Sequence, residues 1–125
     1  MNDRQKVILV VDDEEDIRSL LESFFNGFGY RTLSAADLNQ TVFILNREMP
    51  DIVFLDIVLP GVNGIEILKL LQKLDDNIIV VMMSGYATEA KAKSALQLGA
   101  FDYLSKPFDM SHVKRMLDKI NLIIL

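Results

Sequence analysis

The sequence of 125 residues contains no cysteine and no tryptophan, and only one histidine and three prolines. The absence of cysteine excludes disulfides, thiol catalysis and zinc–thiolate sites, and it agrees with a reducing, cytoplasmic location. The single histidine, His112, has no second ligand near it in the sequence, so we expect it on the surface. No apolar run approaches the roughly 20 residues of a membrane span, and the N-terminus lacks a secretory apolar segment. We therefore expect a cytoplasmic protein without a membrane partner.

Positive charge is also scarce, because the formal net charge is -5 at pH 7. An acidic chain has no general electrostatic attraction to nucleic acid, so we expect no direct nucleic-acid binding. Half of the residues are hydrophobic (50%) and 25% are charged, which excludes a disordered chain. The length fits one domain with a buried core. Residues 1–125 are therefore expected to form a single domain.

Short apolar runs alternate with segments of helical periodicity along the chain. The runs predict strands at residues 6–11, 30–35, 52–55, 78–83 and 101–104. Capping signals or helical spacing of apolar residues follow each run. Strict alternation requires right-handed crossovers, which place helices on both faces of a parallel sheet. The sequence therefore predicts an α/β fold, a three-layer doubly wound sandwich of five strand–helix units around a five-stranded parallel sheet.

Capping residues and apolar stripes predict how the helices sit. Asp37 is an expected N-cap, with Gln40 three residues later, and Asn63 is another. The expected core faces of the two helices that follow are Val42, Ile44 and Leu45, and Ile65, Leu68, Leu71 and Leu74. An Ala-rich helix is expected over residues 88–98, and an amphipathic helix after the N-cap Asp109.

Polar side chains follow four of the five expected strands. Asp12 and Asp13 follow the first strand, Asp56 the third, Ser84 the fourth and Lys106 the fifth. They converge at the C-terminal edge of the sheet if those strands are central neighbours. Three crowded carboxylates repel unless a cation neutralises them, and all-oxygen ligation favours Mg²⁺. A lysine and a hydroxyl add what a phosphoryl group needs, so the set describes a site for placing phosphate on a carboxylate.

Each of these residues also has a plainer interpretation. The acids at residues 12–16 complement a helix dipole, and Asp56 can form the turn before Pro60. Ser84 can simply end a strand, and Lys106 can be a solvated cation. Independent turn residues, however, have no reason to gather as acids, hydroxyl and lysine at one edge. Their joint placement favours the functional interpretation.

The segments around these residues resemble response-regulator receiver domains of two-component signalling, over essentially the full length. The matching segments are residues 10–14 (VVDDE), 55–64 (LDIVLPGVNG), 83–87 (MSGYA) and 99–108 (GAFDYLSKPF). The resemblance implies the strand order 2-1-3-4-5. It also implies a phosphorylation-dependent switch that is regulatory, without enzymatic turnover beyond its own phosphorylation and dephosphorylation. Such a switch receives its phosphoryl group from a sensor histidine kinase or phosphotransfer protein and controls an output domain or target protein.

The resemblance also implies residue roles. Asp56 would be the phosphoacceptor, Lys106 would pair with the phosphoryl oxygens, and Ser84 would bond to one of them. The implied ligands of Mg²⁺, or of another divalent cation such as Mn²⁺, are Asp12, Asp13, Asp56 and the backbone carbonyl of Val58. Tyr103 occupies the aromatic switch position, and the readout surface would be the fourth helix, fifth strand and fifth helix. A cis bond is expected between Lys106 and Pro107.

Two other classes share parts of this pattern. A flavodoxin-like binding protein has the same architecture, but Asp12 and Asp13 would repel a flavin phosphate where that class needs a phosphate-binding loop. An aspartyl-nucleophile phosphohydrolase usually has an Asp-x-Asp arrangement after its first strand, whereas here the two acids are adjacent. Separately, residues 122–125 are apolar on all sides of the last helix. They indicate either a homodimer contact or a domain cut from a longer chain with an output module.

Overall fold

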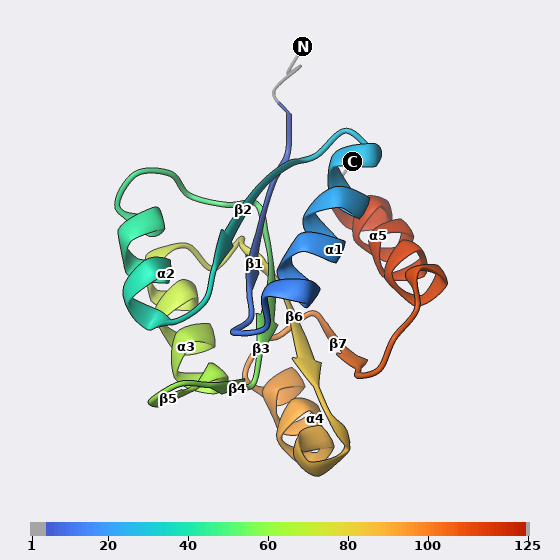
Figure 1. The fold of residues 1–125 in the computed structure, drawn as a ribbon. Coiled ribbons are helices and arrows are strands. Elements are labelled where there is room, and N and C mark those ends of the chain that lie inside the picture. The colour runs from blue at the N-terminus through green and yellow to red at the C-terminus, as the bar shows by residue number, and fades with distance from the viewer. Residues whose placement is uncertain (1–4, 125) are drawn as a thin grey trace.

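The computed structural model of the protein describes residues 5–124, and its centre is a parallel sheet with helices on both faces (Figure 1). The strands in sheet order are β2 (Arg31–Ala35), β1 (Val7–Val11), β3 (Ile52–Asp56), β6 (Ile79–Ser84) and β7 (Asp102–Ser105). Since β6 and β7 are the fourth and fifth strands of this sheet along the chain, the order is the predicted 2-1-3-4-5. The α/β doubly wound prediction is confirmed.

The helices divide between the two faces of the sheet (Figure 1). Helices α1 (Glu15–Gly27) and α5 (Met110–Ile124) cover one face. Helices α2 (Leu38–Leu45), α3 (Gly64–Leu74) and α4 (Glu89–Gln97) cover the other. Each face encloses its own apolar cluster, so the central strands are buried on both sides. This explains why their sequences are continuous apolar runs without alternation.

Strand β1 illustrates how one strand serves both clusters. Leu9 and Val11 pack on the side of α2, α3 and α4, whereas Ile8 and Val10 pack on the side of α1 and α5. Successive side chains of a strand point to opposite faces, so one apolar run supplies both cores. Strand β3 is likewise buried along its whole length. The rigid centre of the sheet therefore fixes the positions at which β1 and β3 end.

The chain between β3 and α3 contains a feature that the sequence did not predict. The expected turn at Pro60 and Gly61 is present, and Gly61 has a φ of 70°. The turn closes a short antiparallel hairpin of β4 (Val58–Leu59) and β5 (Val62–Asn63). Two-residue strands carry too little periodicity to be recognised in a sequence.

Two expected core positions are wrong. Val42 of α2 is 40% exposed, and Leu74 at the end of α3 is 46% exposed. The buried positions of α2 are Thr41 and the predicted Leu45, which are four residues apart and therefore one above the other, and the predicted Ile44 packs against the same cluster while partly buried. The buried Thr41 hydroxyl has a hydrogen-bond partner, because it donates to the backbone carbonyl of Asp37 at 2.8 Å. A polar residue thus takes an inward place that the apolar pattern had assigned to its neighbour.

The start of α4 and the end of α5 add detail that the sequence did not give. A 3₁₀ turn, η1 (Tyr86–Thr88), precedes α4, whose helical bounds lie inside the expected residues 88–98. Leu122 and Ile123 near the end of α5 are 81% and 62% exposed, and the side chains of residues 124 and 125 lie outside the described part. No helix in residues 5–124 is long and apolar enough to cross a membrane.

Candidate functional site

The predicted site residues come together at the C-terminal edge of the sheet. Asp12 follows β1 and is fully buried, and Asp56 ends β3 and is 6% exposed. Ser84 ends β6, and Lys106 follows β7. Strands β1, β3, β6 and β7 are consecutive neighbours in the sheet, which is the condition that the sequence argument required. A cavity of about 270 Å³ lies at this edge, with Asp13, Asp56 and Lys106 among its lining residues.

Lys106 is the cation at the centre of the site. Its Nζ donates to Asp12 Oδ2 at 2.7 Å, to Asp56 Oδ2 at 3.0 Å and to Glu14 Oε1 at 3.2 Å. Burial disfavours the charged ammonium, but the hydrogen bonds to Asp12 and Asp56 outweigh it and raise the pKa of Lys106 above its usual value. The side chain therefore stays protonated, with its charge directed at three carboxylates.

Asp56 is held from two sides. Its Oδ2 accepts from Lys106, and its Oδ1 accepts from the backbone N–H of Val58 at 3.1 Å. Burial raises the pKa of Asp56 above its usual value, and the hydrogen bond from Lys106 opposes this without cancelling it. The carboxylate is thus oriented toward the cavity at an energetic cost, which is the condition of a group arranged for chemistry.

The edge carries more negative charge than one lysine can balance. Carboxylate oxygens of Asp12, Asp13, Glu14 and Asp56 all lie within 4.8 Å of one another. Carboxylates are ligands of hard divalent cations, and such a cation would relieve their repulsion. The donor set therefore fits Mg²⁺ or a similar ion. Glu14 was not predicted as a member of this cluster, although it follows Asp13 directly and belongs to the acidic run at residues 12–16.

Ser84 provides an independent sign of a ligand. The residue is fully buried, and among the described residues its Oγ is the buried side-chain polar atom without a hydrogen-bond partner. A buried hydroxyl left unpaired costs about 1–3 kcal/mol. The hydroxyl is located at the end of β6, the strand beside the one that ends in Asp56. A phosphoryl oxygen on Asp56 is a partner of the right kind for it.

Gly64 is a site residue that sequence reasoning missed. Its N–H donates to the carbonyl of Ile57 at 2.6 Å. A Cβ at this position would collide with the backbone carbonyl oxygen of Asp56 and would lie 2.8 Å from Ile57 Cα. The start of α3 therefore packs directly on the backbone that carries the acceptor carboxylate. Gly64 lies within the matching segment 55–64, but no spacing or capping signal in the sequence gave it a role of its own.

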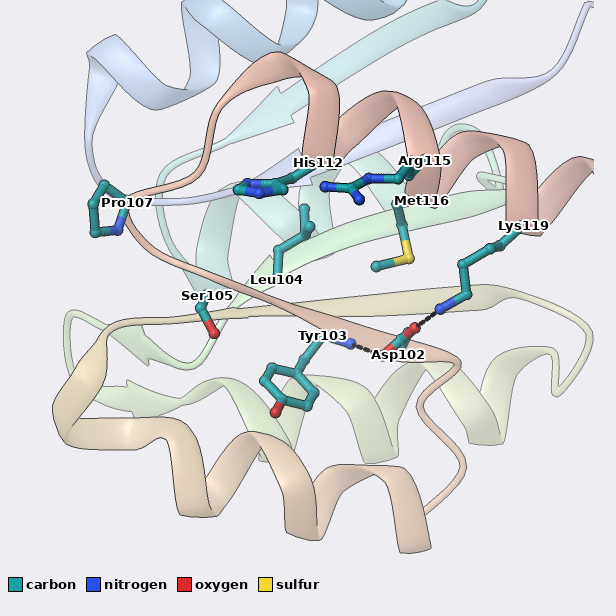
Figure 2. Close-up of a pocket in the computed structure, with 9 residues that line it drawn as sticks. All are labelled: Asp102, Tyr103, Leu104, Ser105, Pro107, His112, Arg115, Met116 and Lys119. Atoms are coloured by element: carbon teal, nitrogen blue, oxygen red, sulfur yellow. Dashed lines mark hydrogen bonds and ion pairs between the residues drawn. The ribbon is translucent and has the colours of Figure 1, made fainter.

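Tyr103 and Lys106 belong to β7 and the loop after it. The Tyr103 hydroxyl donates to Glu89 Oε1 of α4 at 3.3 Å, and its ring packs against the core on that side of the sheet. Figure 2 shows the ring on the opposite side of β7 from His112 and Arg115, which line a cavity of about 410 Å³ between β7 and α5. The Lys106–Pro107 bond is cis, as predicted. The His112 side chain is 47% exposed, which confirms its surface position.

The fold and this edge together define a class of protein: a doubly wound α/β domain with a cluster of acids, a lysine and a buried hydroxyl where its central strands end. The family model described as "Response regulator receiver domain" matches residues 8–118. The chain therefore belongs to the response-regulator receiver family, and it is a phosphorylation-dependent signalling switch of two-component systems. Receiver domains are regulatory and in general bind Mg²⁺.

Three relatives illustrate the similarity. "Sporulation initiation phosphotransferase F" of Bacillus subtilis (strain 168) is 41% identical over 112 residues, covering 90% of each chain. "Regulatory protein AtoC" of Escherichia coli (strain K12) is 37% identical over 94% of this chain, which spans 24% of that protein. The crystal structure of the receiver domain of NtrX from Brucella abortus aligns with a TM-score of 0.84 and 36% identity, covering 90% of this chain and 95% of that one. The shared part is the receiver domain in each case.

Proposed function

We propose that Asp56 is the phosphoacceptor of this domain, with Lys106 and Ser84 as the groups that bind the phosphoryl oxygens. The observation that carries the proposal is the 3.0 Å contact between Lys106 Nζ and Asp56 Oδ2 beside a cavity of about 270 Å³. It places a permanent positive charge next to the one carboxylate that ends a central strand. The unpartnered hydroxyl of Ser84 supports the same assignment.

The transfer exchanges one bond to phosphorus for another. A carboxylate oxygen of Asp56 attacks the phosphorus, and the P–N bond of a donor phosphohistidine breaks as its electron pair returns to the imidazole. With an acyl phosphate as donor, the P–O bond breaks and the carboxylate of the donor leaves. Lys106 neutralises charge on the transferred group, and the Ser84 hydroxyl donates to one of its oxygens.

The acid cluster supplies the metal part of the proposal. Asp12, Asp13 and Asp56 would hold Mg²⁺, or another divalent cation such as Mn²⁺, with the backbone carbonyl of Val58. When bound, the ion neutralises negative charge on the phosphoryl group and on the carboxylates. Asp13 is suited to this role because, within the described residues, it has no hydrogen bond or ion pair of its own.

The switch itself is proposed to run through β7. Phosphorylation would favour the conformation in which Ser84 and Lys106 turn toward the phosphoryl group, and Tyr103 would change its position with them. The surface formed by α4, β7 and α5 would then report the change to an output domain, a target protein or a second copy of the chain. Residues 1–125 would form one cytoplasmic receiver domain whose donor is a sensor histidine kinase or phosphotransfer protein.

Labelling of the purified protein tests the assignment. The protein would be incubated with Mg²⁺ and acetyl phosphate, and its mass and hydroxylamine sensitivity measured. We expect one acyl-phosphate per chain, lost in Asp56→Asn and retained in Asp16→Asn, which removes an exposed acid outside the cluster. Unchanged labelling of Asp56→Asn would refute the acceptor. Sustained turnover of a phosphomonoester would instead support the phosphohydrolase alternative.

A further inference from the structure

Glu14 occupies the boundary between two cavities at the end of α1. It lines the site cavity of about 270 Å³ and also a groove of about 310 Å³. Ile17 and Leu20 of α1 and Phe108 are apolar members of that groove. The Glu14 side chain is 61% exposed, whereas those of Asp12 and Asp56 are 0% and 8% exposed. Glu14 is therefore a charge at the mouth of the site, which a donor meets before it reaches Asp56.

The backbone holds Glu14 in this place. Glu14 is the N-cap of α1, and its N–H donates to Asp12 Oδ1 at 2.9 Å. Its Oε1 accepts from Lys106 Nζ at 3.2 Å, the longest of the three contacts made by that ammonium. Two groups of the site thus position Glu14, because Asp12 binds its backbone N–H and Lys106 binds its carboxylate. A change of charge at Glu14 alters the field at the mouth without removing a buried contact.

Charge balance makes Glu14 the surplus group. With one divalent cation bound, the carboxylates of Asp12, Asp13 and Asp56 would be matched by that ion together with the ammonium of Lys106. Glu14 then leaves the site with a net negative charge before any donor arrives. Arg18 donates through Nη1 to the backbone carbonyl of Asp12 and lines neither cavity, so it does not offset this charge at the mouth. Donors are themselves anionic, so this surplus charge opposes their approach.

We propose that Glu14 is a specificity-determining residue that selects phosphodonors by charge. It disfavours small dianionic acyl phosphates relative to donors in which nitrogen is bound to phosphorus and the charge at the reacting group is smaller. The inference rests on the proposed function, since it concerns donors that phosphorylate Asp56. A donor protein presents its phosphoryl group on an imidazole, and protonation of that ring lowers the net charge of the reacting group from about -2 to about -1, so the surplus charge penalises the protonated form less than a dianionic acyl phosphate.

A different effect of the same contact must be separated from this one. Glu14 also binds Lys106, so its removal frees that ammonium to meet the phosphoryl group. Release of Lys106 would accelerate every donor by a similar factor. Repulsion at the mouth instead scales with donor charge, so the logarithm of the acceleration should be about twice as large for a dianion as for a monoanion. Two donors of different charge therefore distinguish the two effects.

The experiment compares acetyl phosphate, a dianion near neutral pH, with phosphoramidate, a monoanion there. Labelling rates would be measured for the native protein and for Glu14→Gln at saturating Mg²⁺. We expect acceleration on the order of tenfold with acetyl phosphate and about threefold with phosphoramidate, both diminishing as salt is added. Glu15→Gln is the matched control, because it removes the neighbouring exposed charge from outside both cavities and should leave the ratio of rates unchanged.

Other results have distinct meanings. Equal acceleration with both donors, which leaves the ratio of their rates unchanged, would show that Glu14 acts by restraining Lys106 and would overturn the proposal. A ratio shifted in favour of phosphoramidate, or no acceleration with either donor, would overturn it as well. Calorimetric titration with Mg²⁺ alone gives a second measurement. A modest loss of affinity in Glu14→Gln supports a nearby charge, whereas loss of binding would make Glu14 a metal ligand and overturn the proposal. If neither donor labels native Asp56, it is the proposed function that fails.

Discussion

At the scale of single residues, Gly64 limits what the site tolerates. A methyl group there would collide with the carbonyl oxygen of Asp56. Since both partners of the collision are backbone, relief requires a shift of the chain. We expect Gly64→Ala to lower the free energy of unfolding by about 2 kcal/mol, measured by urea denaturation. Gly27→Ala is the control, because nothing lies within 4 Å of its Cβ, and it should be neutral or stabilising.

A substitution at Ser84 should have the opposite effect on stability from the one at Gly64. Its hydroxyl is buried without a partner in the described structure, so removing it relieves a cost in the unphosphorylated protein. We expect Ser84→Ala to leave the unfolding free energy unchanged or to raise it by up to about 1 kcal/mol. If Tyr103 changes its position on phosphorylation as proposed, the tyrosine fluorescence of the native protein should change, and Ser84→Ala should lose that change. A large loss of stability would mean that the hydroxyl already has a partner, and would remove its link to the phosphoryl group.

Single residues also show how far the sequence was informative. The reactive set was predictable because acids, a hydroxyl and a lysine stand directly after apolar runs, and strand ends share one edge. Gly64 and Glu14 were missed because their roles depend on how closely they approach other groups of the site in space. Whether a Cβ meets a carbonyl, or a carboxylate reaches an ammonium, depends on the angle at which a helix leaves the sheet. Linear spacing does not contain that angle.

At the scale of elements, the five strands were the most predictable part. Strands β1, β3 and β6 are buried on both faces, and their sequences are continuous apolar runs rich in β-branched residues; the edge strands β2 and β7 are only partly buried. The short hairpin of β4 and β5 left no such signal. Helix α2 was the least predictable, because in eight residues one polar inward position, Thr41, is enough to displace an apolar stripe by one residue.

Helix α5 offers a prediction at this scale. Asp109 Oδ1 accepts from the backbone N–H groups of Ser111 and His112 at the start of the helix. The hydrogen bond from the Ser111 side chain is the main cause that lowers the pKa of Asp109 below its usual 3.8. An acid with a lowered pKa in the folded state stabilises the fold above its unfolded pKa, and this contribution is lost as the pH falls through the folded value.

The urea midpoint of the native protein should therefore fall as the pH drops below about 4. Asp109→Asn retains an acceptor oxygen but cannot ionise, so its midpoint should fall less steeply over the same range. The comparison of the two slopes isolates Asp109 from the other carboxylates. Equal slopes would show that the charge of Asp109 contributes nothing to the stability of α5.

At the scale of the whole molecule, the sheet both buries and crowds carboxylates at one edge, although burial and crowding each disfavour their charged form. The same packing that buries β1 and β3 brings Asp12 and Asp56 into contact with the ammonium of Lys106, within a cluster that also contains Asp13 and Glu14. Burial raises the pKa of Asp56 despite that ammonium, so the ionised group is held at a cost to the fold. The stability of the domain should therefore depend on the cation that the cluster binds.

Mg²⁺ should raise the melting temperature of the native protein, because an ion that binds only the folded state stabilises it by mass action. The gain is about 2.7 kcal/mol when free Mg²⁺ is about 100 times its dissociation constant. Asp13→Asn should be as stable as the native protein, or more so, in EDTA, since it lowers repulsion within the cluster, yet it should gain much less from Mg²⁺. NaCl at matched ionic strength controls for screening.

Equal gains in the two proteins would mean that Asp13 is no ligand and that Mg²⁺ acts only through the general field. A native protein indifferent to Mg²⁺ would mean that Lys106 alone balances the edge. The first result tests whether Asp13 binds the ion, and the second tests whether the stability of the fold depends on the ion at all.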